Sequence, residues 1–196
     1  AAEQDLQKGF YSVVLKPGEK RPVKPGWLQS RHESQELRDV FVDGANRGRL
    51  MGVPPSAGSK TQGWSVAVDL DLPEAVSLAP SLLPPTGNIG GRASSGRSHY
   101  FYWTDAPMPT RRFRDPIGDM MLELLSTGSQ IAVSPSLHPS GEPYQWWEDG
   151  PAAEVSATDL FVAVTDLAVA TLLLRNSPHN EWLKALQDAT FEDGRI

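Results

Sequence analysis

One stretch constrains the fold of this chain more than any other, and it reads Ser-Val-Ala-Val-Asp-Leu-Asp-Leu over residues 65–72. Its β-branched first half predicts a buried strand. Side chains two residues apart on a strand share a face, so Asp69 and Asp71 should project side by side. Two carboxylates held that close repel each other, and a divalent cation relieves the repulsion; hard oxygen ligands select Mg²⁺ or Mn²⁺. The alternative is two solvated acids at an exposed strand end, although the apolar run before them favours a site.

Size and composition limit the classes of protein to consider. The 196 residues fit one domain over 1–196, with residues 156–196 expected as a C-terminal helical segment packed on the core. The absence of cysteine excludes disulfides and zinc bound through thiolates. No apolar run approaches bilayer length and the first residues lack signal-peptide features, so we expect a cytoplasmic protein with no membrane partner. The net charge of −6 is unlike that of most nucleic-acid-binding domains, but clustered cations allow a basic groove on an acidic body.

A glycine- and serine-rich loop over residues 84–97 leads into an aromatic strand that carries His99. Ser94, Ser95, Gly96 and Arg97 offer hydroxyls, backbone amides and a guanidinium, which together can cradle phosphates. Alone, such a loop is a weak signal, and a single histidine is more often structural than functional.

A third acid, Glu123, lies in the apolar run 120–125, and a turn at 126–128 and a second strand at 130–133 follow it. This pattern predicts a β-hairpin. A carboxylate between apolar residues is costly to bury without a partner, so Glu123 either points to solvent or joins a polar site.

Helical patterns flank these strands. A helix is expected over 34–42, with Ser34 as its N-cap and Asp43-Gly44 as its end. Residues 73–83 suit one or two helical turns. An apolar helix is expected over 157–175 and an amphipathic helix over 181–191. We therefore predict an α+β fold, in which a mixed or antiparallel sheet carries the acids and the histidine on one face and helices lie behind it.

The order of these motifs resembles a known family. Asp69-Leu70-Asp71, His99, Glu123 and the loop Ser-Pro-Ser-Leu-His-Pro-Ser-Gly at 134–141 resemble the primase–polymerase domain of the archaeo-eukaryotic primase superfamily. The similarity is to the bifunctional DNA primase/polymerase N-terminal domains of plasmid and phage replication proteins, over roughly residues 9–146. There are two departures: Arg97 stands where a small residue is usual, and the cysteines of some relatives' zinc element are absent. Asp119 remains an alternative to Glu123 as the third acid.

The resemblance implies a primase-like catalytic core that transfers nucleotides with two metal ions, Mg²⁺ or Mn²⁺, in bacterial plasmid or phage DNA replication. The implied metal ligands are Asp69, Asp71 and Glu123, which with His99 form the catalytic set. The implied nucleotide-binding residues are Ser95, Gly96, Arg97 and His99, and the loop residues Ser136 and His138 are candidates that a purely structural turn explains equally well. Candidates for DNA-backbone contacts are Lys20, Arg21, Lys24, Arg111 and Arg112. The implied partners are a single-stranded DNA template, a primer, dNTP or NTP, and a helicase region fused C-terminally or acting in trans.

Two other functions fit parts of the pattern. A polymerase β-type nucleotidyltransferase also carries Asp-X-Asp after Gly-Ser, here Gly58-Ser59, but residues 60–64 are too few and too glycine-rich for the connecting helix, and His99 is left unexplained. A catalytically inactive DNA-binding replication module would keep the fold without the chemistry, but the presence of all three acids and the histidine disfavours that reading.

Overall fold

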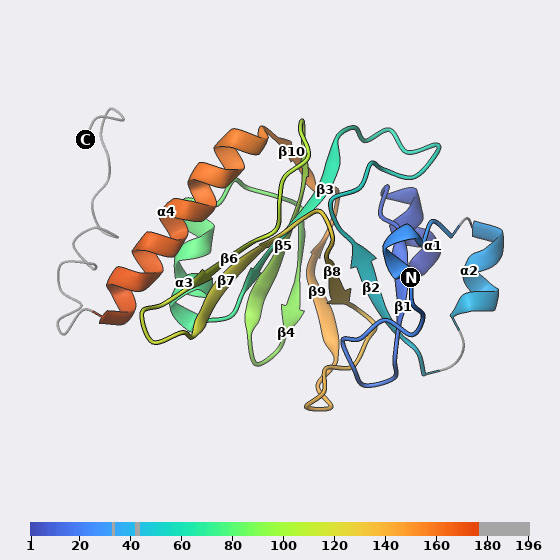
Figure 1. The fold of residues 1–196 in the computed structure, drawn as a ribbon, viewed down its shortest axis with the longest axis horizontal. Helices are drawn as coiled ribbons and strands as arrows, with labels where there is room; N and C mark the ends of the chain where they lie inside the picture. The colour runs from blue at the N-terminus through green and yellow to red at the C-terminus, as the bar shows by residue number, and fades with distance from the viewer. Residues whose placement is uncertain (33, 42–43, 177–196) are drawn as a thin grey trace.

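Two β-sheets form the frame of the computed structural model, which describes residues 1–32, 34–41 and 44–176 (Figure 1). The larger sheet has the strand order β6-β7-β3-β5-β4-β9, with β10 paired in parallel to β5 and every other pairing antiparallel. Its strands are β3 (Trp64–Leu70), β4 (Asn88–Arg92), β5 (Gly96–Thr104), β6 (Arg111–Arg114), β7 (Met120–Leu125), β9 (Tyr144–Asp149) and β10 (Ala153–Val155).

The smaller sheet is antiparallel, with the order β1-β2-β8. Its strands are β1 (Ser12–Leu15), β2 (Asn46–Leu50) and β8 (Gln130–Val133). Helices α1 (Ala2–Gln7) and α2 (Ser34–Val40) lie on its outer side, at the right of Figure 1, and a short 3₁₀-helix, η1 (Trp27–Gln29), follows the loop after β1. Leu6, Val13, Leu37 and Leu50 are buried together between these helices and the sheet.

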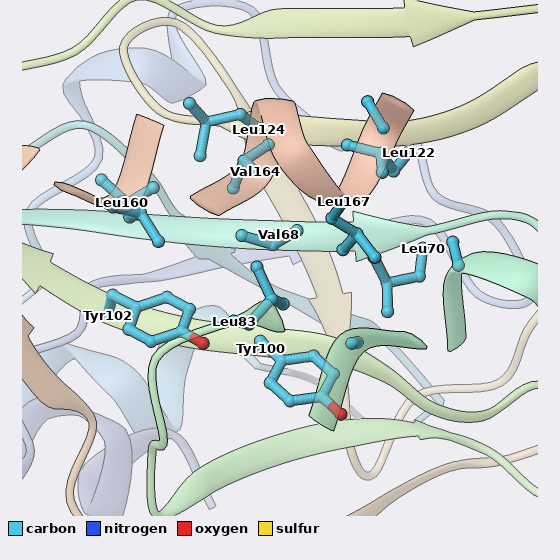
Figure 2. Close-up of a cluster of buried hydrophobic side chains, with 14 of the residues drawn as sticks. Val68, Leu70, Leu83, Tyr100, Tyr102, Leu122, Leu124, Leu160, Val164 and Leu167 are labelled. Carbon is cyan, nitrogen blue, oxygen red and sulfur yellow. The ribbon is translucent and has the colours of Figure 1, made fainter. Parts of the chain in front are cut away.

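One face of the larger sheet is covered by α3 (Pro73–Leu82) and α4 (Ala157–Asn176), which pack against each other (Figure 1). Figure 2 shows side chains of β3, β5 and β7 meeting Leu160, Val164 and Leu167 of α4. Because strand side chains alternate, Val66, Val68 and Leu70 face the helices while Ala67 and Asp69 face the other way. The face that carries Asp69 is therefore free of α3 and α4.

A second apolar cluster joins the two sheets on that opposite face. Its buried members are Phe10, Met51, Ala67, Phe101, Trp103, Leu125, Ile131 and Val133. Ala67 is paired in register with Phe101 on β5 and with Leu125 on β7. Asp69, His99 and Glu123 each lie two residues away from one of these three apolar residues, on the same face of the same strand. On all three adjacent strands, the face therefore changes from apolar to polar side chains at the same level.

A buried charge cluster anchors α1 to both sheets. Arg49 is fully buried, donates from Nη2 and Nε to the carboxylate of Asp5 at 2.6 and 3.0 Å, and donates from Nη1 to Asn88 Oδ1 at 2.6 Å. Its guanidinium lies 4.1–4.5 Å from the ring centroids of Phe10, Phe101 and Trp146. Buried charge is tolerated only with such partners, so these contacts fix α1 against the sheets.

The α+β class and the antiparallel sheet are confirmed, but the hairpin expected over 120–133 is wrong. β7 pairs with β3 and β6 in the larger sheet, whereas β8 pairs with β2 in the smaller one. Leu125 and Ile131 are both buried in the cluster between the sheets. The turn therefore carries the chain from one sheet to the other, because both strands have an apolar face to bury there.

The expectation about membrane-length segments also needs correction. Helix α4 has 20 residues, and an 18-residue window within it has a mean hydropathy of 1.8, which by length and composition alone would allow it to cross a membrane. The same values occur in core helices of soluble proteins, and Leu160, Val164 and Leu167 of α4 pack on the larger sheet. The helix expected over 181–191 and the residues Val42 and Asp43 lie outside the described part of the chain.

Candidate functional site

Three of the four residues in the predicted catalytic set, Asp69, His99 and Glu123, lie next to one another across the larger sheet. Asp69 of β3 is the register partner of Glu123 on β7 and of His99 on β5. Arg112 of β6 is the partner of Glu123 on its other side. Register partners point their side chains to the same face, so residues separated by up to 54 positions in the chain (123 − 69) form one continuous row.

Asp69 and His99 form the centre of this row. The imidazole Nε2 lies 3.2 Å from Asp69 Oδ1, and the His99 ring packs against that of Tyr144 with centroids 5.6 Å apart. Burial acts to raise the pKa of Asp69, but the charge and hydrogen bond of His99, with the charges of Lys20 and Arg92, outweigh it, and the pKa is lowered. Asp69 therefore remains a carboxylate at neutral pH, and His99 is held in place from two sides.

Asp71 follows the last residue of β3, and the charges of Asp69 and Glu123 act on its carboxylate. Partial burial, followed by the charges of Asp69 and Glu123, raises its pKa to about 6, against the opposing effects of Lys20 and His99. This is the repulsion among carboxylates that the sequence predicted. A nearby divalent cation would reverse it.

Glu123 is held by a basic neighbour. Its Oε1 accepts a hydrogen bond from Arg112 Nε at 2.6 Å, and the side chain of Arg112 is 62% exposed. Exposed ion pairs contribute little to stability, about 0–1 kcal/mol, so this guanidinium can exchange partners at low cost. Asp119, the alternative third acid, instead pairs with Arg175 at the end of α4.

Asp69, His99, Glu123 and Arg112 line a polar cavity of about 260 Å³ at the junction of the two sheets, whereas Asp71 is not part of its wall. Asp69, His99 and Glu123 come from the larger sheet, while Gln130, Ile131 and Ala132 belong to β8 of the smaller one. The remaining side chains of functional interest in its wall are Lys20, Trp27, Arg112 and Tyr144. The cavity thus brings acids, cations and aromatic rings together where the apolar core between the sheets ends.

Comparison with known proteins assigns the chain to a family. A family model described as "Bifunctional DNA primase/polymerase, N-terminal" matches residues 2–158. The chain belongs to this family. No curated protein matches the chain. Membership assigns a function of the primase/polymerase type in replication, and with it a nucleotidyltransferase class of enzyme that acts on DNA and nucleotides.

Members of the bifunctional primase/polymerase family generally use divalent metal ions. Within residues 1–32, 34–41 and 44–176, no group of three or more His, Cys, Asp or Glu side chains is arranged to hold a metal ion. One oxygen each of Asp69 and Glu123 is engaged by His99 and Arg112. The donor set nevertheless fits Mg²⁺ or Mn²⁺, because it consists of hard oxygen ligands and includes Asp71, whose pKa is raised first by burial and then by its acidic neighbours.

The expected phosphate-binding loop of this primase/polymerase domain forms the turn between β4 and β5. Ser95 accepts a hydrogen bond from the backbone N–H of Arg92 at 3.2 Å and lies 3.1 Å from Ser98 Oγ, and Gly96 has a positive φ of 64°. Arg97 pairs with Glu148 of β9 and does not line the acidic cavity. Its charge acts instead on the phenol of Tyr100, which packs beneath the helices (Figure 2).

Arg92 is a basic residue that the sequence reasoning missed. Its Nη1 pairs with Glu142 Oε2 at 2.9 Å, and its positive charge lowers the pKa values of Asp69 and His138. The signal that could have identified it is its place at the start of the same glycine- and serine-rich turn. The register shift between Gly90 and Gly91 decides which of Arg92 and Arg97 acts on the cavity, and no sequence pattern reveals that shift.

Ser136 and His138 occupy different environments in the 134–141 loop. Ser136 is buried, and its hydroxyl accepts from the backbone N–H of Arg47 at 2.6 Å and donates to the Arg47 carbonyl at 2.9 Å. That hydroxyl ties the loop to β2. His138 is half-buried, packs edge-on against Tyr144 with centroids 6.0 Å apart, and has a pKa lowered by burial and by Arg92 and Lys20.

The predicted DNA-binding cations are distributed over several surfaces. Lys20 lines the acidic cavity and lowers the pKa of Asp69, and Arg112 lines the same cavity. Lys24 lines a second cavity, and the carbonyl of Arg21 accepts a hydrogen bond from Lys16 N–H at 2.9 Å within its loop. Arg111 is paired in register with Leu124 and therefore alternates to the other face of β6. Gly58-Ser59, the motif of the polymerase β-type alternative, lies in a loop that contributes nothing to the acidic cavity.

Proposed function

We propose that this domain is a DNA primase and DNA polymerase that performs templated nucleotidyl transfer by a two-metal mechanism in plasmid- or phage-type replication. The observation that supports it is the register row Glu123–Asp69–His99, two carboxylates and an imidazole on adjacent strands at the wall of one cavity. A helicase region, fused or acting in trans, would supply the single-stranded template.

Asp69, Asp71 and Glu123 are the residues that would hold Mg²⁺ or Mn²⁺. When bound, such ions act as Lewis acids on the phosphates of the incoming nucleotide. The protein's contribution is a set of fixed oxygens with high negative charge density, in which the ionised state of Asp69 is secured by His99. Arg112 is exposed on its outer side and is placed to leave Glu123 and take a phosphate oxygen instead.

The cations around the cavity suit a triphosphate. Lys20 and Arg92 act electrostatically on both Asp69 and His138, so their positive charge reaches from the acids to the 134–141 loop. His99 faces Asp69 through Nε2, and as an imidazolium it would have a second N–H to donate to a phosphate oxygen. A triphosphate bound between these groups would place its charge against cations on one side and bound metal ions on the other.

The test is synthesis on single-stranded DNA, with and without a primer, using dNTP or NTP and Mg²⁺ or Mn²⁺. We expect Asp69→Asn and Glu123→Gln each to reduce the rate by at least about 10²-fold, the scale of loss for a group that stabilises developing charge. Asp119→Asn is the matched control, because Asp119 pairs with Arg175 away from the cavity, and it should retain synthesis.

The outcomes separate the remaining alternatives. Equal synthesis by the unmodified chain and Asp69→Asn would end the catalytic assignment, and DNA binding without synthesis would favour an inactive replication module. Loss of synthesis in Asp119→Asn with retention in Glu123→Gln would transfer the role of third acid to Asp119.

A further inference from the structure

A second cavity, of about 420 Å³, lies beside the acidic one and has no role in the function proposed above. It is formed by β1, the loop after it, η1 and α2. Its apolar wall consists of Val13, Val14, Pro17, Val23, Trp27, Val40 and Ala45. The polar side chains in its lining are those of Lys24, Ser30, His32 and Asp39. An apolar cavity of this size with a few polar groups has the character of a small-molecule site.

Trp27 connects the two cavities, because it lines both of them. It is half-buried and begins η1 immediately after Gly26, whose φ of +75° is a conformation that glycine adopts readily. The loop before it is anchored to the smaller sheet by hydrogen bonds from Gln130 Nε2 to the Lys20 carbonyl at 2.8 Å and from Val23 N–H to the Val14 carbonyl at 3.0 Å. The indole is therefore a wall that the fold holds between an apolar pocket and the acidic cavity.

We propose that the apolar cavity binds one unpaired nucleobase of the single-stranded template, stacked on Trp27, next to the nucleotide being copied. The proposal rests on the proposed function, since it places the template beside the acidic cavity. Aromatic faces bind bases by stacking without regard to sequence, and cations beside them bind the backbone. Here Lys24 lines the apolar cavity and Lys20 lines the acidic one, so cations are available on both sides of the indole for the phosphates that flank the base.

The template strand fits this cavity better than the incoming nucleotide does. A nucleotide that is being incorporated must leave its pairing edge open to the template. A base enclosed among Val13, Val40 and Ala45 would have that edge hidden. An unpaired template base has no such requirement, and its burial removes apolar surface from water while its phosphates stay at the lysines.

The test compares binding of two labelled oligonucleotides by fluorescence anisotropy at fixed salt: oligo(dT), and a strand of the same length and phosphate number made of abasic sites. The unmodified chain should bind oligo(dT) about tenfold or more tightly. Trp27→Ala should weaken oligo(dT) binding by about 5- to 150-fold, the range that corresponds to about 1–3 kcal/mol of base stacking, with no change for the abasic strand. Trp27→Phe should restore most of the preference, and Trp147→Ala is the control, an exposed tryptophan that lines neither cavity.

Each result decides the proposal. Equal binding of the two strands by the unmodified chain overturns it without need of any variant, so a poorly folded Trp27→Ala cannot protect it. A loss confined to dNTP binding, with oligo(dT) binding unchanged, would also overturn it by assigning the indole to the incoming nucleotide. Failure of the proposed function gives a different result. If the unmodified chain makes no product but prefers oligo(dT), and Trp27→Ala loses that preference, the base pocket is supported and only the polymerase function is rejected.

Discussion

At the scale of single residues, Asp71 shows the conflict between stability and function in this site. Its pKa is raised to about 6 because partial burial and the charges of Asp69 and Glu123 disfavour the carboxylate. The folded chain therefore binds a proton at Asp71 more tightly than the unfolded chain does. The resulting contribution to stability is complete below the ordinary pKa of 3.8 and is lost as the pH rises through about 6.

This sign yields a prediction for Asp71→Asn in the absence of divalent cations. At pH 8 the variant should unfold at a higher temperature than the unmodified chain, because it removes a charge that the other two acids repel. Near pH 4 the difference should disappear, since Asp71 is then largely protonated. Thermal unfolding in EDTA across this pH range measures both values, and a lower unfolding temperature for Asp71→Asn at pH 8 would contradict the electrostatic account. Synthesis by the same variant should be lost, as expected when a strained functional group is replaced.

At the scale of secondary-structure elements, the crossing between the two sheets depends on one close backbone approach. Gly52 follows β2 with a φ of +70°, and a Cβ placed there would lie 2.1 Å from Thr127 N, in the turn between β7 and β8. The turn was predicted from the sequence, but as the end of a hairpin. Strand pairing shows that the chain changes sheets here, and the turn packs against the residues after β2 at that point.

Gly52→Ala should therefore destabilise the fold by more than the left-handed conformation alone requires. Gly128 is the matched control: its φ is +81°, it lies in the same turn, and a Cβ there meets nothing within 4 Å. Gly128→Ala should cost about 1–2 kcal/mol, the penalty for a left-handed non-glycine residue, and Gly52→Ala clearly more. Urea unfolding of both variants measures the difference, and equal losses would show that the turn can move away from β2.

The pairing of strands also explains which parts of the site could be predicted from the sequence and which could not. Strand alternation predicted that Asp69 and Asp71 share a face, whereas Glu123 and His99 were proposed through the resemblance to the primase–polymerase domain; pairing in register brings Asp69, Glu123 and His99 together. The choice between Arg92 and Arg97 was not accessible, because it depends on a register shift between β4 and β5. The wall formed by Trp27 and Tyr144 was missed for a similar reason: these side chains reach the acids only through pairing between distant strands and packing between the sheets.

At the scale of the whole molecule, both sheets contribute residues to the acidic cavity. Elsewhere the two sheets are held together by an apolar cluster and by the ion pairs around Arg49. The acids belong to the larger sheet, whereas Gln130 and Ala132 belong to the smaller one and Lys20 to the loop anchored to it. A metal ion alone would contact the larger sheet. A metal-bound nucleotide would contact both, so its binding energy would also resist their separation.

Unfolding temperatures should therefore respond cooperatively to the two ligands. Ligand binding to the folded state alone stabilises by about 2.7 kcal/mol at a hundred times the dissociation constant. Mn²⁺ and a non-hydrolysable dNTP analogue added together should raise the unfolding temperature by more than the sum of their separate effects, because the ion neutralises carboxylates that otherwise repel the triphosphate. In Glu123→Gln the excess should shrink while the shift from the nucleotide alone remains, since the cations at Lys20 and Arg92 are unchanged. Additive shifts in the unmodified chain would mean that the ion and the triphosphate bind at separate places and that the cavity does not join the two sheets through its ligands.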